Sequence, residues 1–143
     1  MTAYLISPVK LITQEERGQI EQFISAMKIG FDWDIYFPAD DTDQTQGEFS
    51  ACIDNLAATK NAEFVLIWFR PDSLGSILDL GFAMALGKPV ILVNEDELDE
   101  HIMDGEDVRV ARLIRKLSFF SLAEEHDARL DEVRQVYTWL KEN

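Results

Sequence analysis

The fold is decided by the stretch Pro71-Asp-Ser-Leu-Gly-Ser-Ile-Leu-Asp-Leu-Gly-Phe-Ala-Met-Ala-Leu-Gly-Lys-Pro89. It follows the most strand-like run of the chain, Phe64-Val-Leu-Ile-Trp-Phe69, and it leads into a second run, Val90-Ile-Leu-Val93. A strand, a short Gly/Ser loop, a helix and another strand form one βαβ unit with parallel strands. Open parallel sheets bind ligands in the loops at the carboxyl ends of their strands. We therefore expect a ligand site in the loop that opens this stretch.

The composition is that of a globular and strongly acidic chain. Its 143 residues are 47% hydrophobic and 28% charged, with a net charge of -14. This charge repels phosphate backbones and anionic lipid, which argues against a nucleic-acid polymer or a membrane as partner. The length fits one domain, residues 1–143. A single cysteine, Cys52, and no long apolar run predict a cytoplasmic protein.

The rest of the chain predicts alternating strands and helices. Strands are expected at 3–6, 32–37, 63–68 and 90–93, with a brief fifth strand at Ser118-Phe-Phe120. Helices are expected at 14–29, 47–60, 75–87, 95–103 and 108–117, and a closing helix runs to about Leu140. The order predicts an α/β fold, a doubly wound (Rossmann- or flavodoxin-like) parallel sheet of about five strands with helices on both faces.

Local signals mark some of the helix ends and loops. Thr13-x-x-Glu16 and Ser121-x-x-Glu124 are capping boxes that open the first and the last helix. Gly30 is placed to end the first helix. The acidic segment 39–46 lacks the glycine and terminal glutamate of a calcium loop, and we expect it to be a solvated loop.

Asp79 is the candidate catalytic residue of the central helix. Most of its neighbours are apolar, so little of this helix is expected to face solvent; they are Ile77, Leu78, Leu80, Phe82 and Met84. An acid near the first turn is favoured in its ionised form by the helix dipole. A nucleophile needs that form. The alternative is an ordinary solvated helix acid, and residue type alone weighs the two about equally.

Polar residues precede this helix and recur elsewhere on the chain. Ser73, Gly75 and Ser76 form a loop whose N–H groups and hydroxyls can hold an anion, although many strand-to-helix turns contain Gly and Ser. The loop matches neither the P-loop nor the dinucleotide-binding glycine pattern. Asp54 is a second candidate acid, with an exposed helix position as its alternative. The two histidines lack metal-ligand spacing, and neither a metal nor a cofactor is expected.

Three segments together resemble one known family. They are Tyr4-Leu-Ile-Ser-Pro8, then Asp54-Asn-Leu with Ala62-Glu-Phe-Val, then Ser73-Leu-Gly-Ser-x-x-Asp-Leu-Gly-x-Ala83 with Gly87-Lys-Pro89. The pattern is similar to the nucleoside 2-deoxyribosyltransferase family, including its relatives that hydrolyse deoxynucleoside 5′-monophosphates. The resemblance covers roughly residues 3–93, and no motif extends it into the C-terminal third.

The resemblance implies a role for each matching residue. Asp79 would attack the anomeric carbon of the nucleoside, and a second base or water would then take the sugar. Asp54 would protonate or orient the leaving base. The substrate-binding residues would be Tyr4, Ser7, Pro8, Ser73, Gly75 and Ser76, with the serine loop at the 5′ end. The family also implies a homo-oligomer, a dimer through the helices near 47–60 and 75–87, in which a neighbouring subunit completes the pocket.

One residue departs from the family pattern. The nucleophile of the family is normally glutamate, and aspartate is shorter by one C–C bond, ~1.5 Å. A misplacement of about 1 Å can cost on the order of 100-fold in rate. Three functions therefore stay open: an N-glycosidase or deoxyribosyltransferase acting on nucleosides or their 5′-monophosphates, a nucleotide-binding sensor of the same fold without turnover, and a flavodoxin-like binding domain unrelated to nucleosides.

Overall fold

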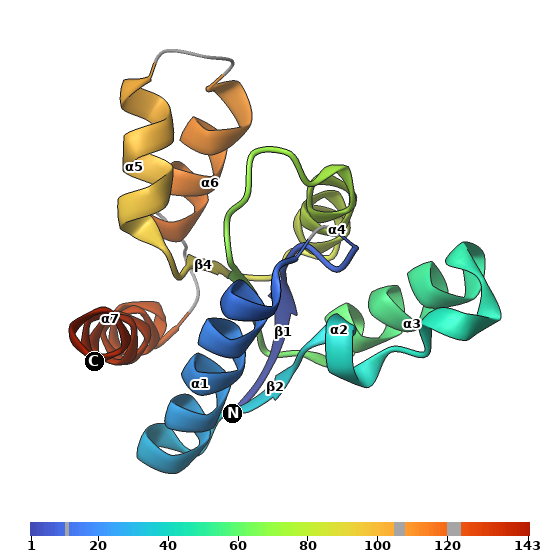
Figure 1. Cartoon of the computed structure of the whole chain (residues 1–143), viewed down its shortest axis with the longest axis horizontal. Coiled ribbons are helices and arrows are strands. Elements are labelled where there is room, and N and C mark those ends of the chain that lie inside the picture. The colour runs from blue at the N-terminus through green and yellow to red at the C-terminus, as the bar shows by residue number, and fades with distance from the viewer. Residues whose placement is uncertain (11, 105–107, 120–123) are drawn as a thin grey trace.

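A parallel β-sheet forms the centre of the computed structural model, which describes residues 1–10, 12–104, 108–119 and 124–143. Its strands are β1 (Thr2–Ile6), β2 (Asp34–Tyr36), β3 (Phe64–Ile67) and β4 (Val90–Leu92), in the order β2-β1-β3-β4 (Figure 1). All three strand pairs are parallel. The order matches the first four positions of the 2-1-3-4-5 doubly wound sheet, which binds ligands beyond the carboxyl ends of β1 and β3.

The helices agree closely with the pattern in the sequence. They are α1 (Gln14–Phe31), α2 (Pro38–Asp41), α3 (Glu48–Asn61), α4 (Leu74–Ala85), α5 (Glu95–Met103), α6 (Arg109–Phe119) and α7 (His126–Glu142), with a 3₁₀ turn, η1, at Gln44–Gln46. The Thr13 hydroxyl caps α1 as predicted, by accepting a hydrogen bond from the N–H of Glu16. Residues 121–123 of the other predicted capping box lie outside the described part of the chain. The last helix begins later than predicted, because α7 starts at His126 with Glu125 as its N-cap residue and has no side-chain capping bond.

The end of α1 differs from the expected one. Gly30 lies inside the helix, and Asp32 is the cap residue, with a left-handed φ of 57°. Asp32 donates its backbone N–H to the Lys28 carbonyl, and its carboxylate pairs with the Lys28 ammonium at 3.1 Å. Aspartate tolerates the left-handed region better than most side chains do, so the helix ends there without a glycine.

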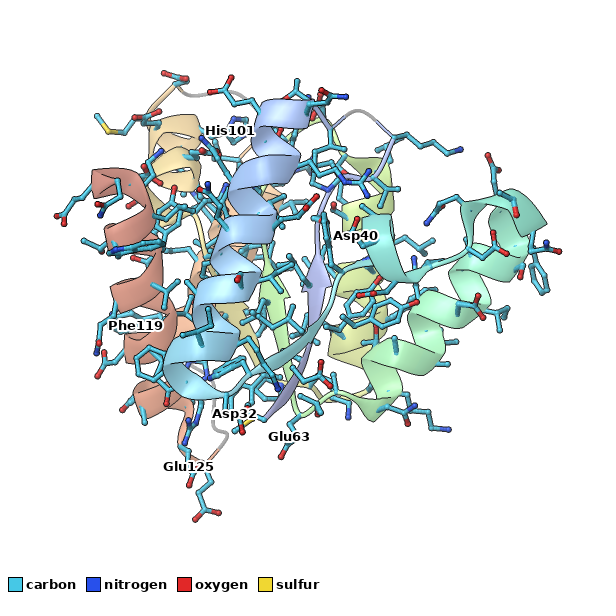
Figure 2. The ribbon with its side chains drawn as sticks, turned by 60° about the horizontal axis from the view of Figure 1, so that its bottom comes forward. Asp32, Asp40, Glu63, His101, Phe119 and Glu125 are labelled. Carbon is cyan, nitrogen blue, oxygen red and sulfur yellow. The ribbon has the colours of Figure 1, made fainter. Side chains whose placement is uncertain are left out.

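Strand alternation divides the core into two layers. Ala3 and Leu5 point to the face covered by α1 and α7, while Tyr4 and Ile6 point to the face that packs against α4 and α6. In Figure 1, α1 and α7 lie on one side of the sheet, and α3 and α4 lie on the other. Figure 2 shows Glu63, which precedes β3, at the lower end of the view and His101 of α5 at the upper end. Because Tyr4 points to the face that α4 covers, its side chain can contact that helix.

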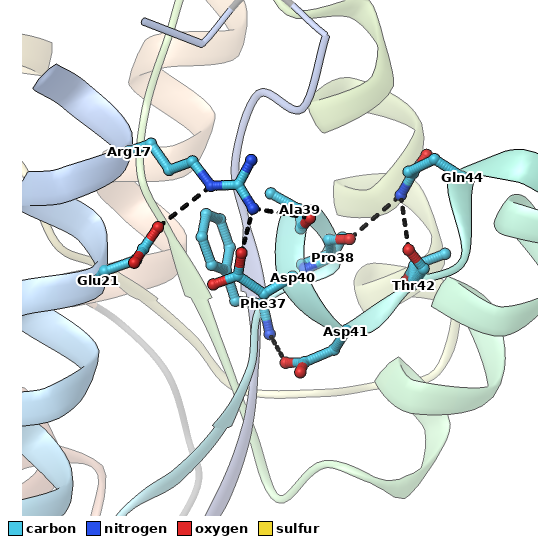
Figure 3. A network of polar contacts seen from close by, with 9 residues as sticks. All are labelled: Arg17, Glu21, Phe37, Pro38, Ala39, Asp40, Asp41, Thr42 and Gln44. Atoms are coloured by element: carbon cyan, nitrogen blue, oxygen red, sulfur yellow. Dashed lines mark hydrogen bonds and ion pairs between the residues drawn. The ribbon is translucent and has the colours of Figure 1, made fainter. Parts of the chain in front are cut away.

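The predicted acidic loop at 39–46 is largely folded. Figure 3 shows its contacts with α1, where Arg17 donates to the Ala39 carbonyl at 3.1 Å and forms an ion pair with Asp40. The carboxylate of Asp41 accepts a hydrogen bond from the backbone N–H of the residue that precedes α2, at 2.8 Å. Two of the acids are therefore structural, because they fix the connection from β2 to α2.

The predicted fifth strand is wrong. Ser118 and Phe119 form the last turn of α6, and residue 120 lies outside the described part of the chain. The N–H of Val93 bonds to β3, so the N–H of Leu92 points to the opposite edge of β4. There it donates to the buried Ser118 hydroxyl at 3.0 Å. A helix side chain thus satisfies the edge strand, and the sheet has four strands in the described ranges.

Ser118→Ala is expected to destabilise the fold. The change leaves the buried N–H of Leu92 without its acceptor, which costs about 1–3 kcal/mol. Ser25→Ala on the exposed surface of α1 is the matched control, because it makes the same change in helix propensity without removing a buried bond. Urea unfolding of both variants measures the difference. Equal midpoints for the two would show that Ser118 does not support the β4 edge.

Candidate functional site

Asp79 is hydrogen-bonded to a tyrosine of the central strand. The Tyr4 hydroxyl donates to Asp79 Oδ2 at 2.8 Å. Tyr4 is fully buried at 0% exposure, and Asp79 is partly buried in the second turn of α4. The bond joins residues 75 positions apart and holds the carboxylate against the sheet rather than in bulk solvent. The ordinary explanation of Asp79 as a solvated helix acid is therefore disfavoured.

Burial sets the protonation behaviour of this pair. Loss of solvent raises the pKa of the Asp79 carboxyl above its usual range, and the Tyr4 hydrogen bond partly offsets this. Burial, followed by the adjacent Asp79 charge, raises the pKa of the Tyr4 phenol far above its usual value. Tyr4 therefore keeps its proton at neutral pH and acts only as a donor to Asp79. A carboxyl with a raised pKa is typical of catalytic sites.

A second tyrosine extends the polar contacts from Tyr4 toward α3. The Tyr36 ring stacks on Tyr4 with centroids 5.7 Å apart. The Tyr36 hydroxyl lies 2.6 Å from Thr42 Oγ1, which donates to Asn55 Oδ1 at 2.7 Å. Because the Thr42 proton goes to Asn55, the Tyr36 hydroxyl must be the donor to Thr42. The sequence contains no pattern that selects Thr42 and Asn55 as site residues, because they join the site only through the pairing of Tyr4 with Tyr36 in the sheet.

The serine loop lies at the start of α4, as the sequence predicts. Ser73 is the N-cap, and its hydroxyl accepts from the N–H of Ser76 and shares a 2.8 Å hydrogen bond with the Ser76 hydroxyl. Both serines line a cavity of about 180 Å³ between α4 and α6. Gly75 is exposed, and a Cβ there would meet no atom within 4 Å. Packing therefore does not require glycine at this position.

The remaining predicted residues lie in other surroundings. Asp54 is exposed and lines a hollow between β2 and α3, which shares no described lining residue with the serine cavity. Ser7 and Pro8 are buried after the end of β1. The Ser7 hydroxyl is buried and lacks a hydrogen-bond partner among the described residues. The structure thus joins Tyr4 to Asp79 and Ser73 to Ser76, and it places Asp54 apart from both.

The basic side chains near these loops are already engaged. Arg70 pairs with Glu16 at 2.8 Å and with Asp72 at 2.9 Å. Lys10 pairs with Glu48 at 2.7 Å. Lys88 donates to backbone carbonyls at the end of α3. An anionic ligand at the serine loop would therefore depend on N–H groups and hydroxyls, or would have to displace one of these pairs.

The described part of the chain has neither a metal-ion cluster nor a membrane-spanning helix. In the described ranges, His, Cys, Asp and Glu residues form no group of three or more that is placed to hold a metal ion. Within those same ranges, every helix is too short or too polar to cross a membrane. No protein-family model, curated protein or solved structure matches the chain. The geometry around Asp79 is therefore the main indication of function.

Proposed function

We propose that the chain cleaves or transfers at the N-glycosidic bond of a (deoxy)nucleoside or its 5′-monophosphate, with Asp79 as the nucleophile. The observation that supports this most is the Tyr4–Asp79 hydrogen bond of 2.8 Å inside a partly buried site. It orients a carboxylate at low solvation on a rigid strand and helix, which is how an acid is prepared for attack on carbon. The resemblance of residues 3–93 to the nucleoside 2-deoxyribosyltransferase family supports the same chemistry.

The reaction follows from the two carboxylate oxygens. Tyr4 holds Oδ2, so Oδ1 keeps its lone pairs for the anomeric carbon. The new C–O bond forms as the C–N bond breaks, and the bonding pair leaves with the base nitrogen, which takes a proton. Water or a second base then attacks the same carbon and frees Asp79. Both steps pass through an oxocarbenium-like transition state.

Asp54 is the proposed partner of the leaving base. Its neighbour Asn55 bonds to Thr42, Thr42 bonds to Tyr36, and Tyr36 stacks on Tyr4, so a series of contacts links this turn of α3 to the Tyr4–Asp79 pair. The Asp54 carboxylate itself faces the neighbouring hollow. Its contribution is therefore expected to be smaller than that of Asp79.

An assay of free base tests the proposal. Deoxynucleosides, ribonucleosides and their 5′-monophosphates are incubated with the folded chain, and released base is separated by chromatography. We expect release from at least one substrate class, and a second free base in the mixture distinguishes transfer from hydrolysis. Absence of release from the whole panel would overturn the enzymatic proposal.

A nucleotide-binding module without turnover is the second candidate. It is favoured by the direction of the Asp79 pKa shift, because burial stabilises the protonated carboxyl, which is not a nucleophile, relative to the carboxylate. Titration calorimetry on the same panel discriminates the two candidates. Saturable heat without base release would support the module.

The proposal also includes a homodimer. Large apolar side chains of α3 and α4 face solvent, and Phe49 and Leu74 are each 81% exposed. The two helices contact each other (Figure 1), so these exposed side chains belong to neighbouring helices. We propose that these exposed apolar side chains of α3 and α4 are covered by a second copy of the chain.

Substitution on this face is expected to produce monomers. Phe49→Asp or Leu74→Asp places a charge on the proposed interface, which should raise the dimer dissociation constant by at least about 10-fold. Ile29→Asp is the matched control, because Ile29 is 85% exposed but lies on α1. Light scattering after gel filtration reports the mass of each variant. A monomeric parent, or loss of the dimer in all three variants alike, would contradict the proposed interface.

A further inference from the structure

The cavity between α4 and α6 takes no part in the bond-breaking step proposed at Asp79, although the family resemblance assigns its two serines to the 5′ end of the substrate. Its walls come from β3, from α4 and from α6, and they include Ile67, Leu80, Ala111 and Ile114. The polar residues that line it include Ser73, Ser76 and His101. Asp79 is absent from its lining, because the carboxylate is turned toward Tyr4. The cavity is therefore a separate feature of the same helix.

We propose that this cavity is a binding site for a small, neutral ligand with a compact apolar body and one hydroxyl-type end. The proposal does not depend on N-glycosidic chemistry. The volume of about 180 Å³ is below the range of pockets for drug-sized molecules. It is close to that of an engineered apolar cavity, of about 150 Å³, that stays dry and takes up benzene. A single ring with one small substituent matches this space.

The serine pair supplies the polar contact. Two hydroxyls carry two protons, and one of these is used in the 2.8 Å bond between Ser73 and Ser76. The N–H of Ser76 occupies one lone pair of the Ser73 oxygen. One proton and several lone pairs are left, so the pair can both donate to and accept from a ligand hydroxyl. The apolar walls offer the rest of the ligand only van der Waals contacts.

The cavity adjoins an acidic hollow, and this disfavours anions. Phe69, Arg70, Pro71 and His101 line both spaces, so they form the boundary between them. His101 lies at the carboxyl end of the sheet, where this boundary is found (Figure 2). Arg70 is neutralised by Glu16 and Asp72. The hollow beyond the boundary is also lined by Glu15, Glu97, Glu100 and Asp104. Their negative field opposes entry of a carboxylate ligand.

Three single-ring probes of similar size test the proposal on the full chain. They are benzyl alcohol, toluene and benzoate, and methyl NMR follows isoleucine, leucine and valine signals. We expect benzyl alcohol to shift the methyl signals of Ile67, Leu80 and Ile114 saturably, with a dissociation constant on the order of 1 mM. Benzoate should bind at least about 10-fold more weakly. No saturable shift up to about ten times that constant, or equal binding of benzoate, would overturn the proposal.

Substitutions in the cavity lining test whether the probes bind in this cavity. Ala111→Leu fills the cavity and should abolish the shifts, and Val110→Phe, at a less buried lining position, tests the same point if the first variant does not fold. Ser73→Ala combined with Ser76→Ala should weaken benzyl alcohol roughly 2- to 10-fold and leave toluene unchanged. Toluene is the internal control that the cavity survives in this variant. Shifts that persist in a folded cavity-filling variant, or equal losses for both ligands, would place the ligand elsewhere.

Discussion

Asp79→Asn is expected to lower the rate of base release by about 1,000-fold or more while the chain stays folded. Asparagine has nearly the same shape, and its side-chain oxygen can still accept the Tyr4 hydroxyl proton. Its amide, however, is not a nucleophile, and loss of the nucleophile removes the covalent route altogether. Nucleoside binding should persist, because only one atom of the side chain has changed. Single-turnover assays with titration calorimetry measure both quantities.

The stability of the same variant gives an independent check. The folded-state pKa of Asp79 is raised by burial, so the folded chain binds this proton more tightly than the unfolded chain does. The protonated Asp79 carboxyl makes its full contribution to the free energy of unfolding below the pKa that it has in the unfolded chain. This contribution is lost as the pH rises through the higher pKa of the folded chain. Asparagine does not titrate, so the Asp79→Asn variant does not lose stability in this way as the pH rises. Asp79→Asn should therefore unfold at an equal or higher temperature than the parent at pH 7.

Two further substitutions make the result specific. Asp131→Asn, on the exposed surface of α7, should change neither base release nor stability. Asp54→Asn should lower base release by about 100-fold, the range expected for a group that protonates the leaving base. Equal release rates in Asp79→Asn and the parent would remove the nucleophile assignment. A melting temperature lower than that of the parent would contradict the buried environment of the carboxyl.

The main features of the fold could be predicted because they depend on local patterns. Apolar runs of strand length alternate with segments of helical period, and this alternation predicts a parallel sheet. The prediction of a fifth strand was wrong, because contacts distant in sequence determine how this edge of the sheet is completed. The run Ser118-Phe-Phe120 resembles a short strand in the sequence, but Ser118 and Phe119 continue the amphipathic helix that begins at Arg109. The hydrogen bond from Leu92 to Ser118 then satisfies the sheet edge, which the sequence does not reveal.

The candidate site was predictable in part. Ser73 and Ser76 are three residues apart at a helix start, and this spacing indicates the capping bond that the structure contains. The partner of Asp79 could not be predicted from periodicity, because apolar residues surround it on α4 and do not define a single buried face. Tyr4 reaches it only because β1 lies next to β3 in the sheet. Strand order, a long-range property, therefore determines which side chain orients the acid.

Asp79→Glu is expected to lower base release by about 100-fold, although it restores the residue that the resembling family uses. The Tyr4 hydroxyl already meets the aspartate at 2.8 Å, and Tyr4 is fixed in a fully buried strand. One additional methylene moves the carboxylate by ~1.5 Å. Either the hydrogen bond or the direction of attack must then change, and a displacement of this size typically costs on the order of 100-fold. The kinetic measurement is kcat/KM for the best substrate of the panel.

Tyr4→Phe shows whether the tyrosine is the reason for this loss. Alone, the change removes the orienting bond and should lower kcat/KM by about 10-fold. In the double variant with Asp79→Glu, the Tyr4 hydroxyl that would displace the longer carboxylate is absent. The fold-loss in kcat/KM of the double variant should therefore be smaller than the product of the two single fold-losses. Losses that simply multiply would mean that Tyr4 does not set the carboxylate position. An Asp79→Glu variant faster than the parent would instead show that the pocket is built for the longer acid, and the parent chain would then be better explained as a nucleotide-binding module.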